Sequence, residues 1–95
     1  MTTYRAQFLG AVPNGWERDD VLARVVSIVS SIHDVDAASV SFLDVHQQTA
    51  AVVVRFRADL DAEARDIVTS VIRDLPGSYD ALLDRRDRKY TRITL

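Results

Sequence analysis

Residues 37–57 read AASVSFLDVHQQTAAVVVRFR, and this stretch decides the fold class. In its first half apolar residues alternate with serines, and in its second half Val52, Val54 and Phe56 take every second position. Such alternation puts every second side chain on one face of a β-strand. Because the polar residues 46–48 separate the two runs, the pattern predicts an antiparallel hairpin.

A segment with helical spacing stands on each side of this hairpin. Residues 17–32 and residues 59–75 repeat apolar side chains at intervals of three or four, which gathers them on one side of a helix. Asn14 and Glu17 have the spacing of a capping box at the start of the first helix. The dipeptide Pro76-Gly77 is expected to end the second helix.

Both ends of the chain are expected to add a strand. Residues 4–9 alternate, and residues 90–95 are rich in residues that favour strands. Residues 78–89 contain few apolar side chains and end in the charged run DRRDRK, so we expect a loop with one helical turn there. The predicted order is β-α-β-β-α-β in a single domain that spans residues 1–95.

This order predicts an α+β sandwich of two layers with a ferredoxin-like arrangement. Right-handed crossovers place both helices on one face of a four-stranded antiparallel sheet with strand order 4-1-3-2. The other face is expected to be open, and it mixes arginines with Leu9, Leu43 and Val53. Because apolar side chains on an open sheet face favour association, these three residues are predicted to form an interface. The arginines expected on this face are Arg5, Arg55, Arg57 and Arg92.

Composition argues against several classes of function. The chain has no cysteine, so it has no disulfide and no thiolate metal site. Its net charge of -2 argues against a general nucleic-acid binder, and the open-face arginines lack the aromatic partners of an RNA-recognition sheet. The apolar runs are too short to span a bilayer, and the N-terminus lacks the pattern of a signal peptide. We therefore expect a cytoplasmic protein without membrane insertion.

The sequence contains no catalytic motif, phosphate loop or metal-ligand cluster, and we expect no catalysis, cofactor or metal. His33 and His46 are predicted at opposite ends of a strand, too far apart to share a metal. The expected topology brings the loop at residues 13–16, the hairpin turn and residues 78–89 to one end of the sheet. There Trp16 would supply an apolar wall, and the arginines would supply charge for an acidic partner. The candidate ligand- or partner-binding residues are Asn14, Trp16, His46, Arg85, Arg86 and Arg88.

Residues 20–28, DVLARVVSI, and residues 38–42, ASVSF, resemble the first helix and second strand of ACT-type regulatory domains. The predicted order of elements agrees with that family along most of the chain. The resemblance implies a regulatory appendage that dimerises by joining sheets or packing helices. It also implies a small-ligand loop between the first strand and the first helix, where Pro13-Asn14-Gly15 is the nearest match.

We therefore expect a non-enzymatic interaction or regulatory module that self-associates or docks on a partner protein. Two alternatives stay open. One is a small-ligand sensor of ACT type that uses the loop around Asn14 and Trp16. The other is a dimeric α+β barrel enzyme, in which two open sheet faces enclose a pocket.

Overall fold

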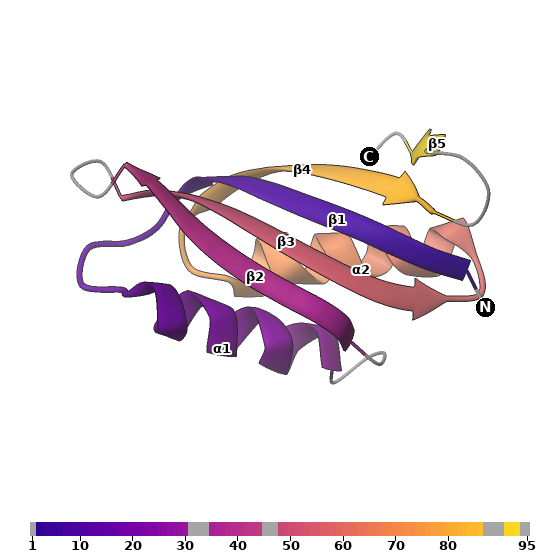
Figure 1. The fold of residues 1–95 in the computed structure, drawn as a ribbon, viewed down its shortest axis with the longest axis horizontal. Helices are drawn as coiled ribbons and strands as arrows, with labels where there is room; N and C mark the ends of the chain where they lie inside the picture. The colour runs from indigo at the N-terminus through magenta and orange to yellow at the C-terminus, as the bar shows by residue number, and fades with distance from the viewer. Residues whose placement is uncertain (1, 31–34, 45–47, 87–90, 94–95) are drawn as a thin grey trace.

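The computed structural model describes residues 2–30, 35–44, 48–86 and 91–93, which form an α+β fold of two helices and a five-stranded antiparallel sheet (Figure 1). The helices are α1 (Arg18–Ser30) and α2 (Asp61–Asp74). The sheet has the order β2-β3-β1-β4-β5. Its strands are β1 (Thr2–Ala11), β2 (Val35–Asp44), β3 (Thr49–Ala58), β4 (Ser78–Arg85) and β5 (Thr91–Ile93).

The predicted pairing of the first strand with the hairpin is confirmed. β1 runs antiparallel to β3 with Tyr4 opposite Phe56, and β2 pairs with β3 with Val40 opposite Val52. Two register shifts in β2, one between Val35 and Ala37 and one near its C-terminal end, interrupt the regular ladder. The hairpin thus forms one half of the sheet, as its alternating pattern requires.

The prediction of a loop is wrong for residues 78–85, which form β4, while residues 87–89 lie outside the described residues. The predicted four-stranded sheet and the order β-α-β-β-α-β are corrected to five strands in the order β-α-β-β-α-β-β. β4 pairs with β1 along its whole length, and β5 adds a fifth strand outside β4. Leu83 is the one residue of β4 that is fully buried, while Asp80 and Asp84 alternate with it toward the open face. A strand near the edge of a sheet needs few buried side chains, which explains why its composition is typical of a loop.

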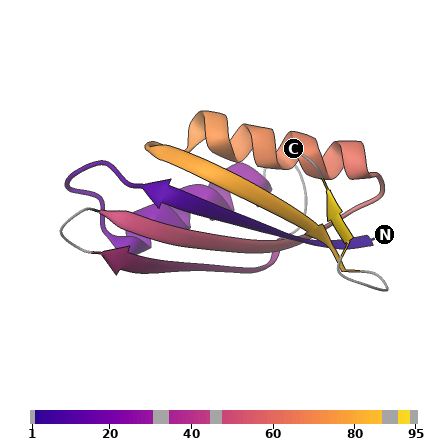
Figure 2. The same cartoon turned by 90° about the horizontal axis from the view of Figure 1, so that it is seen from above.

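Both helices cover one face of the sheet, as predicted (Figures 1 and 2). α1 packs against β2, α2 packs against β3 and β4, and the two helices contact each other. The rings of Tyr4 and Phe56 stack within this layer, with centroids 5.8 Å apart, near the end of the sheet where β2 begins and β4 ends. The sheet and the helices bury one continuous apolar cluster whose largest members are Tyr4, Phe8, Phe56, Ile67, Leu83, Val21, Val25 and Val29.

The start of α1 differs from the predicted capping box. Gly15 has a φ of 90°, and the backbone N–H of Trp16 donates to the carbonyl of Pro13 at 3.3 Å, so a turn delays the helix. The N–H of Glu17 then donates to the carboxylate of Asp20 at 2.9 Å. Glu17 and Asp20 therefore take the positions that Asn14 and Glu17 were predicted to hold.

A polar link joins β1, α2 and β4 at the far end of the sheet. The hydroxyl of Tyr4 donates to Oδ1 of Asp61 at 2.6 Å, and Nη1 of Arg85 lies 3.6 Å from Oδ2 of the same carboxylate. Asp61 is the first residue of α2, where a negative charge also favours the helix dipole. Neither helix in the described part of the chain has the length and apolar character to cross a membrane.

Candidate functional site

The residues predicted to form one site at the loop end lie at two ends of the sheet. Asn14 and Trp16 belong to the connection between β1 and α1, where β4 begins. Arg85 ends β4 at the opposite end of the sheet, and the N–H of Arg86 donates to the carbonyl of Thr3 at 2.8 Å. The prediction that these arginines gather near Trp16 is wrong because β4 carries the chain across the whole sheet.

Three of the predicted residues have no described side chain. His46 and Arg88 lie outside the described residues. The backbone of Leu43 belongs to β2, but its side chain is not among those described. The predicted roles of these three residues stay predictions.

The open face of the sheet carries an apolar strip, which we define as Leu9, Val53 and Leu82. Leu9 is 45% exposed, Leu82 is 43% exposed and Val53 is half-buried. Gln7 of β1 is the register partner of both Val53 and Leu82, so the strip crosses three neighbouring strands. The predicted positions of Leu9 and Val53 on this face are confirmed. The sequence does not predict Leu82 on this face, because residues 78–81 alternate but Leu82 and Leu83 are both apolar and interrupt the pattern.

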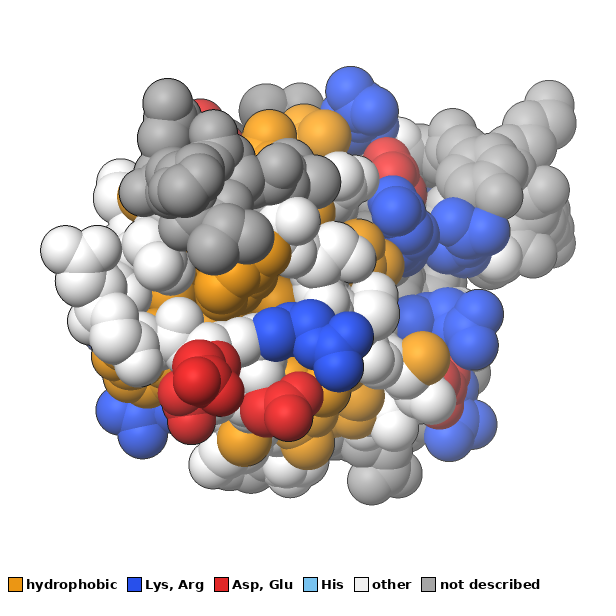
Figure 3. Space-filling model, turned by 60° about the vertical axis from the view of Figure 1, so that its left-hand side comes forward, with side chains coloured by type: hydrophobic (Ala, Val, Ile, Leu, Met, Phe, Trp, Pro, Cys, Tyr) orange, Lys and Arg blue, Asp and Glu red, His pale blue; other side chains and the backbone are white. Residues whose placement is uncertain are grey.

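Charges of both signs surround the apolar strip. Arg5 of β1 is flanked in register by Arg55 of β3 and by Asp84 of β4. Nε of Arg92 lies 3.6 Å from Asp84. Lys and Arg side chains gather toward the right of the face drawn in Figure 3. Within the described residues, the carboxylates of this face thus come from β4 and, at Asp36, from β2, while β1, β3 and β5 contribute guanidinium groups.

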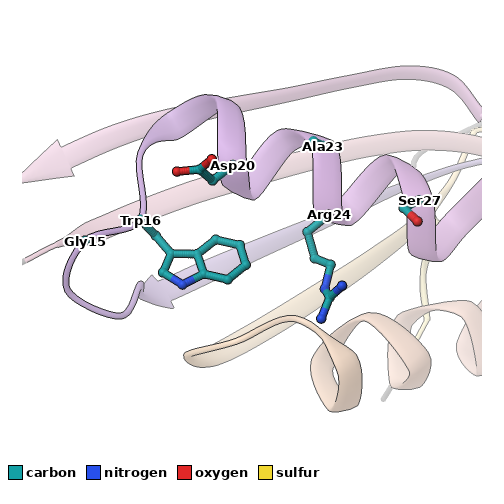
Figure 4. Close-up of a pocket in the computed structure, with 6 residues that line it drawn as sticks. All are labelled: Gly15, Trp16, Asp20, Ala23, Arg24 and Ser27. Atoms are coloured by element: carbon teal, nitrogen blue, oxygen red, sulfur yellow. The ribbon is translucent and has the colours of Figure 1, made fainter.

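A hollow of about 460 Å³ lies beside Trp16 (Figure 4). The indole of Trp16 and the guanidinium of Arg24 point to the same side of α1, and Trp16 also packs against the core. A hydrogen bond from Arg73 holds the pKa of Asp74 below its ordinary value, and the charge of Arg24 acts in the same direction. The hollow is therefore lined by an aromatic ring, that of Trp16, and by a positive charge, that of Arg24. Its lining residues are Gly15, Trp16, Asp20, Ala23, Arg24 and Ser27.

Neither surface contains the side chains of a metal centre. Within residues 2–30, 35–44, 48–86 and 91–93, no three His, Cys, Asp or Glu residues come close enough to hold a metal ion. The groups available for chemistry on the open face are guanidiniums, carboxylates and hydroxyls. Such groups can bind anions and partner proteins through hydrogen bonds and charge.

Comparison of the chain with protein-family models and with curated proteins finds no match.

Proposed function

We propose that this chain is a non-enzymatic interaction module that self-associates through the open face of its sheet. The observation that carries the proposal is the apolar strip, since Leu9 and Leu82 lie about half exposed on adjacent strands of the face opposite the helices. Helices cover the other face, whereas the described residues place no element over this one. Contiguous exposed apolar side chains of this kind mark interaction surfaces.

A second copy is the partner that fits this face best. In a dimer with two-fold symmetry, the same surface of both copies forms the interface. This surface must therefore carry both the positive and the negative side chain of every ion pair across the interface. The open face meets this condition because Asp80 and Asp84 lie on β4, while Arg5 and Arg55 lie on β1 and β3. A face with charges of one sign would repel its own copy.

The expected dimer is weak. Burial of the exposed half of one leucine contributes on the order of 1 kcal/mol. A two-fold dimer buries Leu9 and Leu82 of both copies. Association costs at least about 4 kcal/mol in lost freedom of motion. The leucines therefore do little more than offset this cost, so the remaining apolar area and the polar contacts set the affinity, and we expect a weak dimer.

Sedimentation equilibrium across micromolar concentrations tests the proposal. Leu82→Lys should shift the protein toward the monomer, because it puts a charge into the apolar strip. The matched control is Ile72→Lys on α2, where Ile72 is 41% exposed and Leu82 is 43% exposed. A parent chain that stays monomeric at several hundred micromolar would contradict self-association, as would equal effects of the two variants.

The hollow beside Trp16 favours a second candidate, a small-ligand sensor of ACT type. Its aromatic wall and its guanidinium, at Trp16 and Arg24, match the apolar and acidic parts of a small organic acid or amino acid. A panel of amino acids should then raise the melting temperature of the parent chain but not of Arg24→Gln. This candidate fails if no compound in the panel changes the melting temperature of the parent.

A further inference from the structure

A second hollow lies on the open face of the sheet, over β1, β2 and β3. Its volume is about 250 Å³. Its polar side chains are the guanidiniums of Arg5, Arg55 and Arg86 and the hydroxyl of Ser39, and Val53 forms part of its apolar wall together with Ala37 and Ala38. None of the described residues that line it carries a carboxylate. We call it the arginine hollow.

Its central feature is a pair of like charges in direct register. Arg5 and Arg55 stand opposite each other on β1 and β3, which places their Cβ atoms about 4.5–5.5 Å apart. Like charges in this position destabilise a sheet, and an anion bound between them would lower their repulsion. The pair is central in the sheet, because β2 lies outside β3 and β4 lies outside β1.

Among the described residues, other arginines of the sheet make ion pairs with carboxylates, whereas Arg5 and Arg55 do not. Nε of Arg57 lies 3.3 Å from Asp36, and Nε of Arg92 lies 3.6 Å from Asp84. Arg5 instead donates a hydrogen bond of 3.4 Å to the neutral side chain of Gln7. Arg55 makes no ion pair with any residue that the structure describes. Asp84 is the register partner of Arg5 on β4, but its carboxylate lies 3.6 Å from Arg92. Within the described residues, the charge of Arg5 and Arg55 is therefore compensated less than that of Arg57 and Arg92.

A third guanidinium, that of Arg86, and the hydroxyl of Ser39 also line the hollow. The backbone of Arg86 is fixed beside β1 by its hydrogen bond to the carbonyl of Thr3, 2.8 Å long. Ser39 is the register partner of Val53, so its hydroxyl adds a neutral donor on the β2 side. Guanidinium groups bind phosphate oxygens through two parallel N–H groups, and several of them together favour a dianion over a monoanion.

We propose that the arginine hollow binds the phosphate group of a small phosphate monoester. Its volume is below that of pockets for drug-sized ligands, so it fits a phosphate and a few carbon atoms. The phosphate lies between Arg5 and Arg55, and the carbon atoms contact Val53. The hollow shares Val53, Arg5 and Arg55 with the face of the proposed dimer. A phosphate and a second copy should therefore compete for this face, and the titration is repeated with Leu82→Lys, whose side chain does not line the hollow.

Titration followed by amide chemical shifts tests this proposal, with inorganic phosphate and glycerol 3-phosphate as probes at an ionic strength held constant by sodium chloride. Both probes should shift the amides of residues 37–39 and 53–55 in a saturable way. Glycerol 3-phosphate should bind more tightly because its carbons reach the apolar wall. Arg5→Gln and Arg55→Gln should each weaken binding at least tenfold.

Arg65→Gln is the matched control, because it removes the same charge from the exposed surface of α2. This variant should bind both probes like the parent. Circular dichroism of every variant checks that the fold is kept, and Arg55→Lys, which keeps the charge but loses the fork of donors, should bind with intermediate affinity. The proposal is overturned if neither probe gives saturable shifts, or if Arg65→Gln loses as much affinity as Arg55→Gln. It also fails if a single-stranded oligonucleotide shifts these amides while both phosphate probes do not.

Discussion

Two stacked rings, Tyr4 of β1 and Phe56 of β3, are among the largest buried side chains of the core. Phe56 is fully buried, and its ring lies 5.8 Å from that of Tyr4 at an angle of 18°. Phe56→Ala leaves a cavity that the neighbouring strands cannot close, so it should lower the free energy of unfolding by about 3–5 kcal/mol. Urea denaturation followed by circular dichroism measures this loss. Leu60→Ala is the control, since Leu60 is 60% exposed and its truncation should cost less than about 0.5 kcal/mol.

Tyr4 also contributes through its hydroxyl, which donates to Asp61 at 2.6 Å. Tyr4→Phe keeps the stacked ring and removes a hydrogen bond to a carboxylate, which should cost about 1.5–3 kcal/mol. A double-mutant cycle with Asp61→Ala separates this bond from the other contacts of Tyr4. If the two substitutions have additive effects, the hydroxyl and the carboxylate are not coupled and the hydrogen bond contributes nothing to stability.

At the scale of elements, the turn between α2 and β4 has a strict requirement at Gly77. Its φ is 125°, and a Cβ there would lie 2.2 Å from the carbonyl oxygen of Ala11. Gly77→Ala should therefore lower the free energy of unfolding by about 2–4 kcal/mol through strain and steric overlap.

Gly15→Ala separates these two causes. Gly15 has a φ of 90°, but a Cβ at this position meets nothing within 4 Å. Its substitution should therefore cost only the backbone strain, about 1 kcal/mol. Equal losses in the two variants, measured by urea denaturation, would show that the contact with Ala11 is relieved by a small movement of the turn.

The elements differ in how clearly the sequence predicts them. The hairpin and both helices follow from residues 37–57 and from the helical spacing on either side, because each of these elements buries one regular set of apolar side chains. β4 could not be recognised in the same way, since only Leu83 is fully buried and the strand continues into a charged run. β4 also determines which residues can form the candidate site. As a strand it carries Arg85 to the far end of the sheet, whereas a loop would keep Arg85 near Trp16.

Register explains why the arginine hollow was not predicted as a site. The sequence places Arg5 and Arg55 on the open face, but only the pairing of β1 with β3 sets them opposite each other. Arg86 joins them because β4 has a length that ends beside Thr3. Sites of this kind depend on the lengths of strands, and composition and periodicity do not fix those lengths.

At the scale of the whole molecule, one core connects every major element that the structure describes. The buried residues form a single cluster, to which β1, β2, β3, β4 and both helices contribute. The radius of gyration is 12.7 Å, close to the value of about 12 Å expected for a compact domain of this length. Because no part of this layer has a core of its own, the elements should unfold together.

Urea denaturation should therefore show a single cooperative transition, with a free energy of unfolding of about 5–10 kcal/mol. Trp16 is the one tryptophan and packs against the core, so its fluorescence reports on the loop end of the sheet, while far-UV circular dichroism reports on the helices and strands. The two transitions should coincide in midpoint and slope, at a protein concentration low enough to keep the chain monomeric. A fluorescence transition that precedes the other would show that the turn before α1 opens by itself. The hollow beside Trp16 would then belong to a locally mobile segment, and a ligand bound there should bring the two transitions back together.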